Sequence, residues 1–151
     1  MNEGIAKAKE FYNQGLRFLK CAERCMGEVQ EDGSILIIGG KYPCLSAPTM
    51  VNMAFSCECF LKSILIIYGV QYKKVHGLKE LYDLLPGKEL KEYLQVGEDF
   101  EKELEKHSLD FVAWRYYIEE PGDYAMSPMF TDILMRNLNI LAKRVISDYI
   151  G

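Results

Sequence analysis

An acid and a base lie four residues apart inside an apolar stretch of the sequence. The segment from Met53 to Gly69 reads MAFSCECFLKSILIIYG, and its two charged residues are Glu58 and Lys62. On a helix this spacing places both side chains on one face, with the acid first, which favours an ion pair. One interpretation is a surface pair where neighbouring helices leave this helix uncovered. The other is a buried polar network completed by groups from other helices, because a charge removed from water needs partners.

A second group of candidates follows later in the chain. The segment FVAWRYYIEE surrounds Arg115 with aromatic residues, including Tyr116, and aromatic rings can stack on a guanidinium that binds a carboxylate. Alternatively, this segment packs into the core and Arg115 pairs with Glu119, one turn further on. His76 and His107 adjoin predicted helix ends, where a structural role is the simpler interpretation.

The sequence lacks the signatures of several enzyme and cofactor classes. It contains no G-x-S-x-G motif, and the glycine pair at 39–40 is not followed by the Gly-Lys-Ser/Thr of a phosphate-binding loop. Cys21 and Cys25 share a helix face, but Cys57 and Cys59 are two residues apart and point to nearly opposite sides of theirs. We therefore expect no metal site and no cofactor.

The hydrophobic pattern predicts helices over most of the chain. An amphipathic helix runs from residue 3 to about 26, and Gly15 within it marks a close approach to a neighbouring helix. Residues 27–46 form a long connection, in which ILII at 35–38 is either a hairpin arm or an apolar flap. Further helices are expected over residues 46–68, around 78–85, through the helical pattern of 88–120, and over 127–149.

These elements predict an all-α, up-and-down bundle of five to six helices in one domain, 1–151. The chain has 151 residues, 49% hydrophobic and 26% charged, as in soluble globular domains. Five cysteines without a framework spacing suit a reducing compartment, and the amino terminus carries charges where a secretory signal needs an apolar block. We expect a cytoplasmic protein without a membrane span. The net charge of −4 gives no reason to expect broad nucleic-acid binding, although a local basic patch is compatible with it.

Three stretches together resemble the HEPN superfamily of small helical bundles, found in prokaryotic toxin–antitoxin and defence systems and in nucleotidyltransferase-associated proteins. They are APTMVNMAFSCECFLKSILIIYG, HGLKELYDLL and FVAWRYYIEE, and they span residues 47–120. The resemblance implies a helical bundle, commonly a homodimer, with a protein partner such as a nucleotidyltransferase or an antitoxin. Active branches of the superfamily are metal-independent ribonucleases that carry an Arg, four to six residues, and then a His.

This chain departs from the ribonuclease motif. Its arginines are at 17, 24, 115, 136 and 144, its histidines are at 76 and 107, and no Arg precedes a His by that interval. We therefore expect a non-catalytic module that binds a protein partner, a nucleotide or RNA.

Two other functions stay open at the level of sequence. One is a metal-independent ribonuclease or nucleotide-handling enzyme, with a non-standard site built from Glu58, Lys62, His76, Arg115 and Tyr116. The other is a purely structural interaction subunit. The sharpest structural expectation is that Glu58 meets a cation beyond Lys62, with Arg115 as the first candidate.

Overall fold

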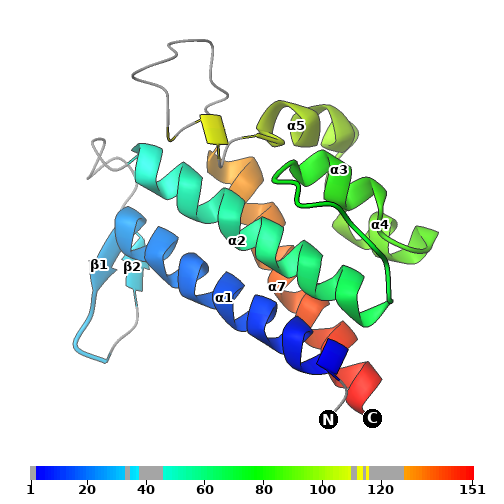
Figure 1. Cartoon of the computed structure of the whole chain (residues 1–151). Coiled ribbons are helices and arrows are strands. Elements are labelled where there is room, and N and C mark those ends of the chain that lie inside the picture. Colours follow the sequence, from blue (N-terminus) through cyan, green and yellow to red (C-terminus); the bar gives the residue numbers. More distant parts are fainter. Residues whose placement is uncertain (1–2, 33–34, 38–45, 110–111, 114, 116–127) are drawn as a thin grey trace.

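Three long helices form the frame of the fold. Helices α1 (Glu3–Met26) and α2 (Ser46–Ile67) run antiparallel, and α7 (Pro128–Ile150) packs against both (Figure 1). The computed structural model describes residues 3–32, 35–37, 46–109, 112–113, 115 and 128–151. The predicted all-α bundle is confirmed, with six helices among the described residues.

Three short helices pack against α2 and α7. They are α3 (Leu78–Asp83), α4 (Lys88–Leu94) and α5 (Phe100–His107), and Figure 1 shows them grouped together. Gly87 separates α3 from α4 with a φ of 79°, a backbone conformation that glycine adopts without strain. Each short helix buries one apolar face, through residues such as Leu81, Leu94 and Leu104.

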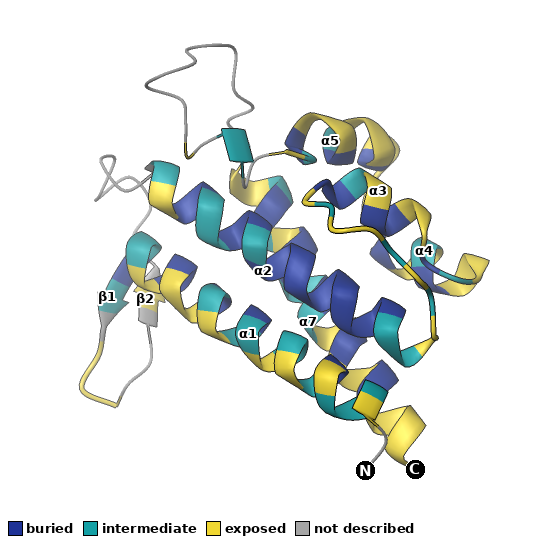
Figure 2. Cartoon of the chain, in the orientation of Figure 1, coloured by how far each residue is buried: buried dark blue, intermediate teal, exposed yellow. Residues whose placement is uncertain are grey.

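Helix α2 is the centre of the core. Residues 56–65 are all buried (Figure 2), because neighbours surround this part of the helix and its sequence is apolar on nearly every face. The window Ala47–Ile67 is long and apolar enough to cross a membrane, with a mean hydropathy of 1.6, but 72% of it is buried inside the bundle. Such burial is typical of the core helix of a globular domain.

Helices α1 and α2 approach each other closely at Gly15, as the sequence predicts. A Cβ atom at this position would lie 2.6 Å from the Phe60 ring. Two buried hydroxyls also join the helices, since Ser56 Oγ donates to the Gly15 carbonyl and Ser63 Oγ to the Ala8 carbonyl, each at 2.8 Å. The bonds are seven residues apart on both helices, so they fix the register of the antiparallel pair.

The connection after α1 contains a hairpin, which confirms one of the two structures expected for ILII. Strand β1 (Gly27–Val29) pairs antiparallel with β2 (Ile35–Ile37), with Glu28 opposite Leu36. The hairpin lies beside the end of α1 (Figure 1). The predicted helical pattern through 116–120 falls outside the described residues.

Candidate functional site

Glu58 and Lys62 form a buried ion pair on α2. Lys62 Nζ lies 2.5 Å from Glu58 Oε1, and the exposed fractions of the two side chains are 9% for Lys62 and 2% for Glu58. The pair is buried because α2 is covered on nearly all sides. The surface interpretation of this pair is therefore wrong and its burial is confirmed, although the group that completes the network, His76, comes from a connection and not from another helix.

His76 completes the network from the connection between α2 and α3. Its Nδ1 atom lies 3.1 Å and 3.2 Å from the two carboxylate oxygens of Glu58. These are hydrogen-bond distances, and Nδ1 is the donor when the carboxylate is ionised, because an ionised carboxylate only accepts hydrogen bonds. The imidazole is half-exposed, and it therefore links the buried acid to the surface of the molecule.

The second cation expected at Glu58 was Arg115, and that assignment is wrong. Among the described residues, the polar partners of the Glu58 carboxylate are Lys62 and His76, while Arg115 is exposed. The reason is topological: the chain turns back after α2 and brings His76, eighteen residues later, to the middle of that helix. Tyr116 lies outside the described residues.

Lys62 also lines a cavity of about 530 Å³, which we call the lysine pocket. Its walls come from the first half of α1, the end of α2, and the connection between α2 and α3. The lining residues are Gly4, Lys7, Phe11, Lys62, Ile66, Gly69, Val70, Gln71, Tyr72 and Lys74. Three of them are lysines and none is acidic, so the pocket is suited to an anion.

Phe11 and Tyr72 give the lysine pocket an apolar surface beside its charged side chains. Lys62 Nζ lies 5.7 Å from the centre of the Tyr72 ring, within the range of a cation–π contact. Burial raises the pKa of the Tyr72 hydroxyl, and the nearby Glu58 carboxylate raises it further. Tyr72 therefore keeps its proton at neutral pH and can donate a hydrogen bond to a ligand.

Cys59 lies next to the ion pair but is not a reactive thiol. Burial raises its pKa to about 12, the Glu58 charge adds to this effect, and the Lys62 charge opposes it. A nucleophilic cysteine needs a lowered pKa, so Cys59 serves as a small core side chain.

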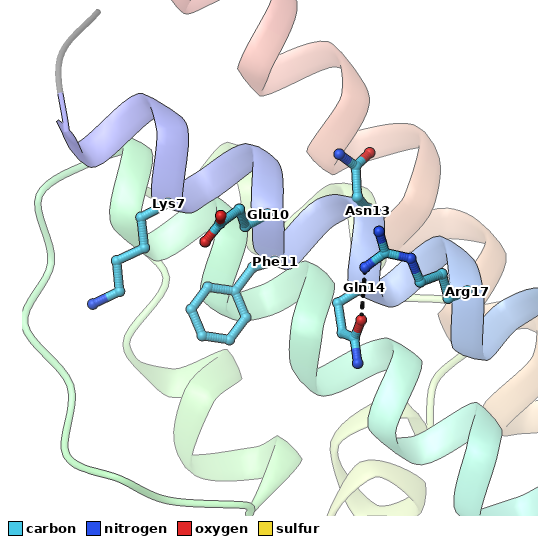
Figure 3. Close-up of a pocket in the computed structure, with 6 residues that line it drawn as sticks. All are labelled: Lys7, Glu10, Phe11, Asn13, Gln14 and Arg17. Atoms are coloured by element: carbon cyan, nitrogen blue, oxygen red, sulfur yellow. Dashed lines mark hydrogen bonds between the residues drawn. The ribbon is translucent and has the colours of Figure 1, made fainter.

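A shallower hollow on the outer face of α1 adjoins the lysine pocket. It has a volume of about 420 Å³ and shares Lys7 and Phe11 with the pocket (Figure 3). Glu10 lies beside Phe11 in Figure 3, and Arg17 Nη1 donates to Gln14 Oε1 at 3.0 Å. Because this hollow mixes acid, base and amide groups along a single helix, it offers weaker selectivity than the lysine pocket.

The other residues considered from sequence divide between core and surface. His107 is fully buried and its ring stacks on Phe130, with ring centres 5.5 Å apart, which agrees with a structural role. The described cysteines are free thiols, with Cys21 exposed and Cys57 buried. Among the described residues, no group of three or more His, Cys, Asp or Glu side chains is arranged to hold a metal ion.

Four lining residues of the lysine pocket were not predicted from the sequence as site residues. They are Lys7, Lys74, Phe11 and Tyr72. Lys7 and Lys74 are exposed, and each looks like an ordinary solvated charge until the fold brings it near Lys62. One local signal was available: the QYKK segment at 71–74 places an aromatic residue beside two bases, shortly after the helix that carries the buried pair.

Comparisons with family models, with curated proteins and with solved structures find no match to this chain.

Proposed function

We propose that this protein is a HEPN-like helical module that acts by binding a phosphate-bearing ligand, a nucleotide or RNA, in the lysine pocket. The observation that carries the proposal is the position of Lys62, a buried lysine held by Glu58 and open to a cavity that it shares with two further lysines. In this proposal the protein works in the cytosol, as a homodimer or with a protein partner such as a nucleotidyltransferase or an antitoxin.

The charges of the pocket support an anionic ligand. Glu58 balances one of the three lysine charges from behind Lys62, so Lys7 and Lys74 supply the uncompensated charge in the lining. Lysine binds phosphate as a point charge, and its flexible stem lets it follow the ligand. Phe11 and Tyr72 provide faces on which a base can stack.

The three lysines would have different roles in binding, because Lys62 is buried whereas Lys7 and Lys74 are exposed. Lys62 cannot move far, because Glu58 and the surrounding core hold its stem in one position. A fixed ammonium defines where one phosphate oxygen lies, whereas the exposed Lys7 and Lys74 contribute attraction over a longer range. Glu58 and His76 are then positioning residues, which act on the ligand through Lys62.

A binding experiment tests the proposal with two probes, a fluorescent ATP analogue and a fluorescein-labelled eight-nucleotide single-stranded RNA. We expect Lys7→Ala and Lys74→Ala each to weaken binding about tenfold, since each removes one phosphate contact worth about 1.4 kcal/mol. For RNA, each change should also reduce the slope of log K against log salt concentration by about 0.7. Fluorescence anisotropy at several salt concentrations measures both quantities.

The matched control is Lys88→Ala, which removes an exposed lysine of α4 outside the pocket. Its affinity for either probe should stay within about twofold of the wild type. The proposal is wrong if neither probe binds, or if Lys88→Ala weakens binding as much as the two pocket variants. Binding of only one probe identifies the ligand as a nucleotide or as RNA.

A second candidate function is metal-independent RNA cleavage, and one observation favours it. His76 is a half-exposed imidazole oriented by a buried carboxylate, the arrangement that prepares a histidine to act as a general base. Incubating the RNA probe with purified protein and EDTA decides the matter. Cleavage that is lost in His76→Gln, while binding persists, would support catalysis, whereas an intact probe would leave binding as the function.

A further inference from the structure

An apolar groove lies on the side of the bundle formed by the end of α4, α5 and the first half of α7. It has a volume of about 260 Å³, and Phe100, Phe130 and Leu134 form its inner part. Three apolar side chains at its edge are open to solvent: Val96 is 47% exposed, Met129 73% and Ile133 39%. Exposed apolar side chains gathered around a groove are characteristic of an interaction site.

The charges beside this groove are acidic. Residues 98–106, with the sequence EDFEKELEK, carry five carboxylates and two lysines, a local net charge of −3, and Lys106 pairs with Glu103 at 2.6 Å. Glu98 and Asp99 are exposed and follow Val96 after one glycine, and Glu103 lines the groove itself. This charge repels nucleic acid and anionic lipid surfaces, and it attracts a protein segment that carries lysine or arginine.

We propose that this groove docks an amphipathic segment of a protein partner whose apolar side chains enter the groove and whose basic side chains face the acidic residues. The segment would follow the helix-in-groove mode, in which apolar anchors at i, i+3, i+4 and i+7 give affinity and the flanking charges select the partner. The groove and the lysine pocket have no lining residue in common, so this surface is separate from the proposed ligand site.

Two synthetic peptides test the proposal against the full chain. Both are helical, with leucines at i, i+3, i+4 and i+7; one carries lysines on its polar face and the other carries glutamates. We expect the lysine peptide to bind at least about tenfold more tightly in a fluorescence anisotropy titration, because only its charges complement the exposed Glu98 and Asp99. Ile133→Asp should weaken this binding about tenfold by placing a charge among the anchors.

Two further variants make the outcome decisive. Ile140→Asp changes an apolar residue of α7 outside the groove that is even more exposed than Ile133, 56% against 39%, and it should leave binding within about twofold of the wild type. The double variant Glu98→Lys with Asp99→Lys alters exposed residues only and should reverse the preference between the peptides. It remains informative even if Ile133→Asp fails to fold, which circular dichroism would reveal.

Three results would overturn the proposal. The first is equal binding of both peptides, or of neither, to the wild-type chain. The second is an unchanged preference in the Glu98→Lys, Asp99→Lys variant. The third is a wild-type dimer that Ile133→Asp converts to a monomer in sedimentation velocity, which would show that a second copy of this chain occupies the groove.

Discussion

Glu58 and Lys62 illustrate how burial changes the energetics of a charge pair. An exposed pair at the same spacing contributes less than about 1 kcal/mol, because water screens both charges. When the pair is buried, each residue becomes necessary to the other, since removing one leaves a charge in the core without its partner. The half-exposed His76 adds a hydrogen-bond donor but remains partly solvated.

We therefore expect Glu58→Gln to lower the free energy of unfolding by about 3–5 kcal/mol, as for other broken buried pairs. The double variant Glu58→Gln with Lys62→Met should recover much of the lost unfolding free energy, because it removes the Lys62 ammonium that the single variant leaves buried without a carboxylate. Urea denaturation followed by circular dichroism measures both values. The control is Glu92→Gln, which breaks an exposed pair with Lys88 at the same spacing and should cost less than about 1 kcal/mol. Equal losses in Glu58→Gln and Glu92→Gln would contradict this account.

At the scale of the elements, the contact between α1 and α2 reverses an ordinary rule of helix stability. Replacing a glycine in a helix with alanine normally stabilises it by about 1 kcal/mol. At Gly15 the added methyl group would lie 2.6 Å from a Phe60 ring atom, and that ring is fully buried and cannot move aside freely.

Gly15→Ala should therefore destabilise the protein by about 1–3 kcal/mol, the usual effect of overpacking a core. A smaller side chain at the facing position, in the double variant Gly15→Ala with Phe60→Leu, should be more stable than the sum of the two single changes predicts. A double-mutant cycle from urea denaturation gives this coupling energy. A stabilising effect of Gly15→Ala, or additive single effects, would show that the contact is not tight.

Much of the fold at this scale could be predicted from the sequence. The ends of α1 and α7 follow from amphipathic periodicity, and the pairing of Glu58 with Lys62 follows from local helix geometry. The third member of the network could not be predicted, because the choice between His76 and Arg115 depends on how the chain turns after α2. Lys7 was missed for the same reason, since nothing local distinguishes it from a solvated charge, and the only local sign of Lys74 was its place beside Tyr72 in the QYKK segment.

For the molecule as a whole, the core is one continuous cluster. It includes Leu19 of α1, Phe60 of α2, Leu81 of α3 and Leu138 of α7, together with residues of α4 and α5. No described helix therefore has a core of its own, and we expect the bundle to unfold in one cooperative step.

Two probes test this expectation in urea. Far-UV circular dichroism reports the loss of helix, and mass spectrometry of alkylated peptides reports when the buried thiols of Cys57 and Cys59 become accessible. The two midpoints should coincide, while Cys21, which is exposed, should react without denaturant. Exposure of Cys57 and Cys59 before the loss of helix would reveal a partly unfolded state and contradict a single transition.

The hydroxyl bonds from Ser56 and Ser63 to α1 have a consequence for ligand size. Sliding α1 along α2 by one helical turn would move Lys7 about 5.4 Å relative to Lys62 and would break both bonds. Ser56, Ser63 and Gly15 thus fix the position of α1 along α2, and this position determines the width of the lysine pocket. A change in ligand preference would then arise most easily from the 68–77 connection, which carries Tyr72 and Lys74 and lies outside both long helices.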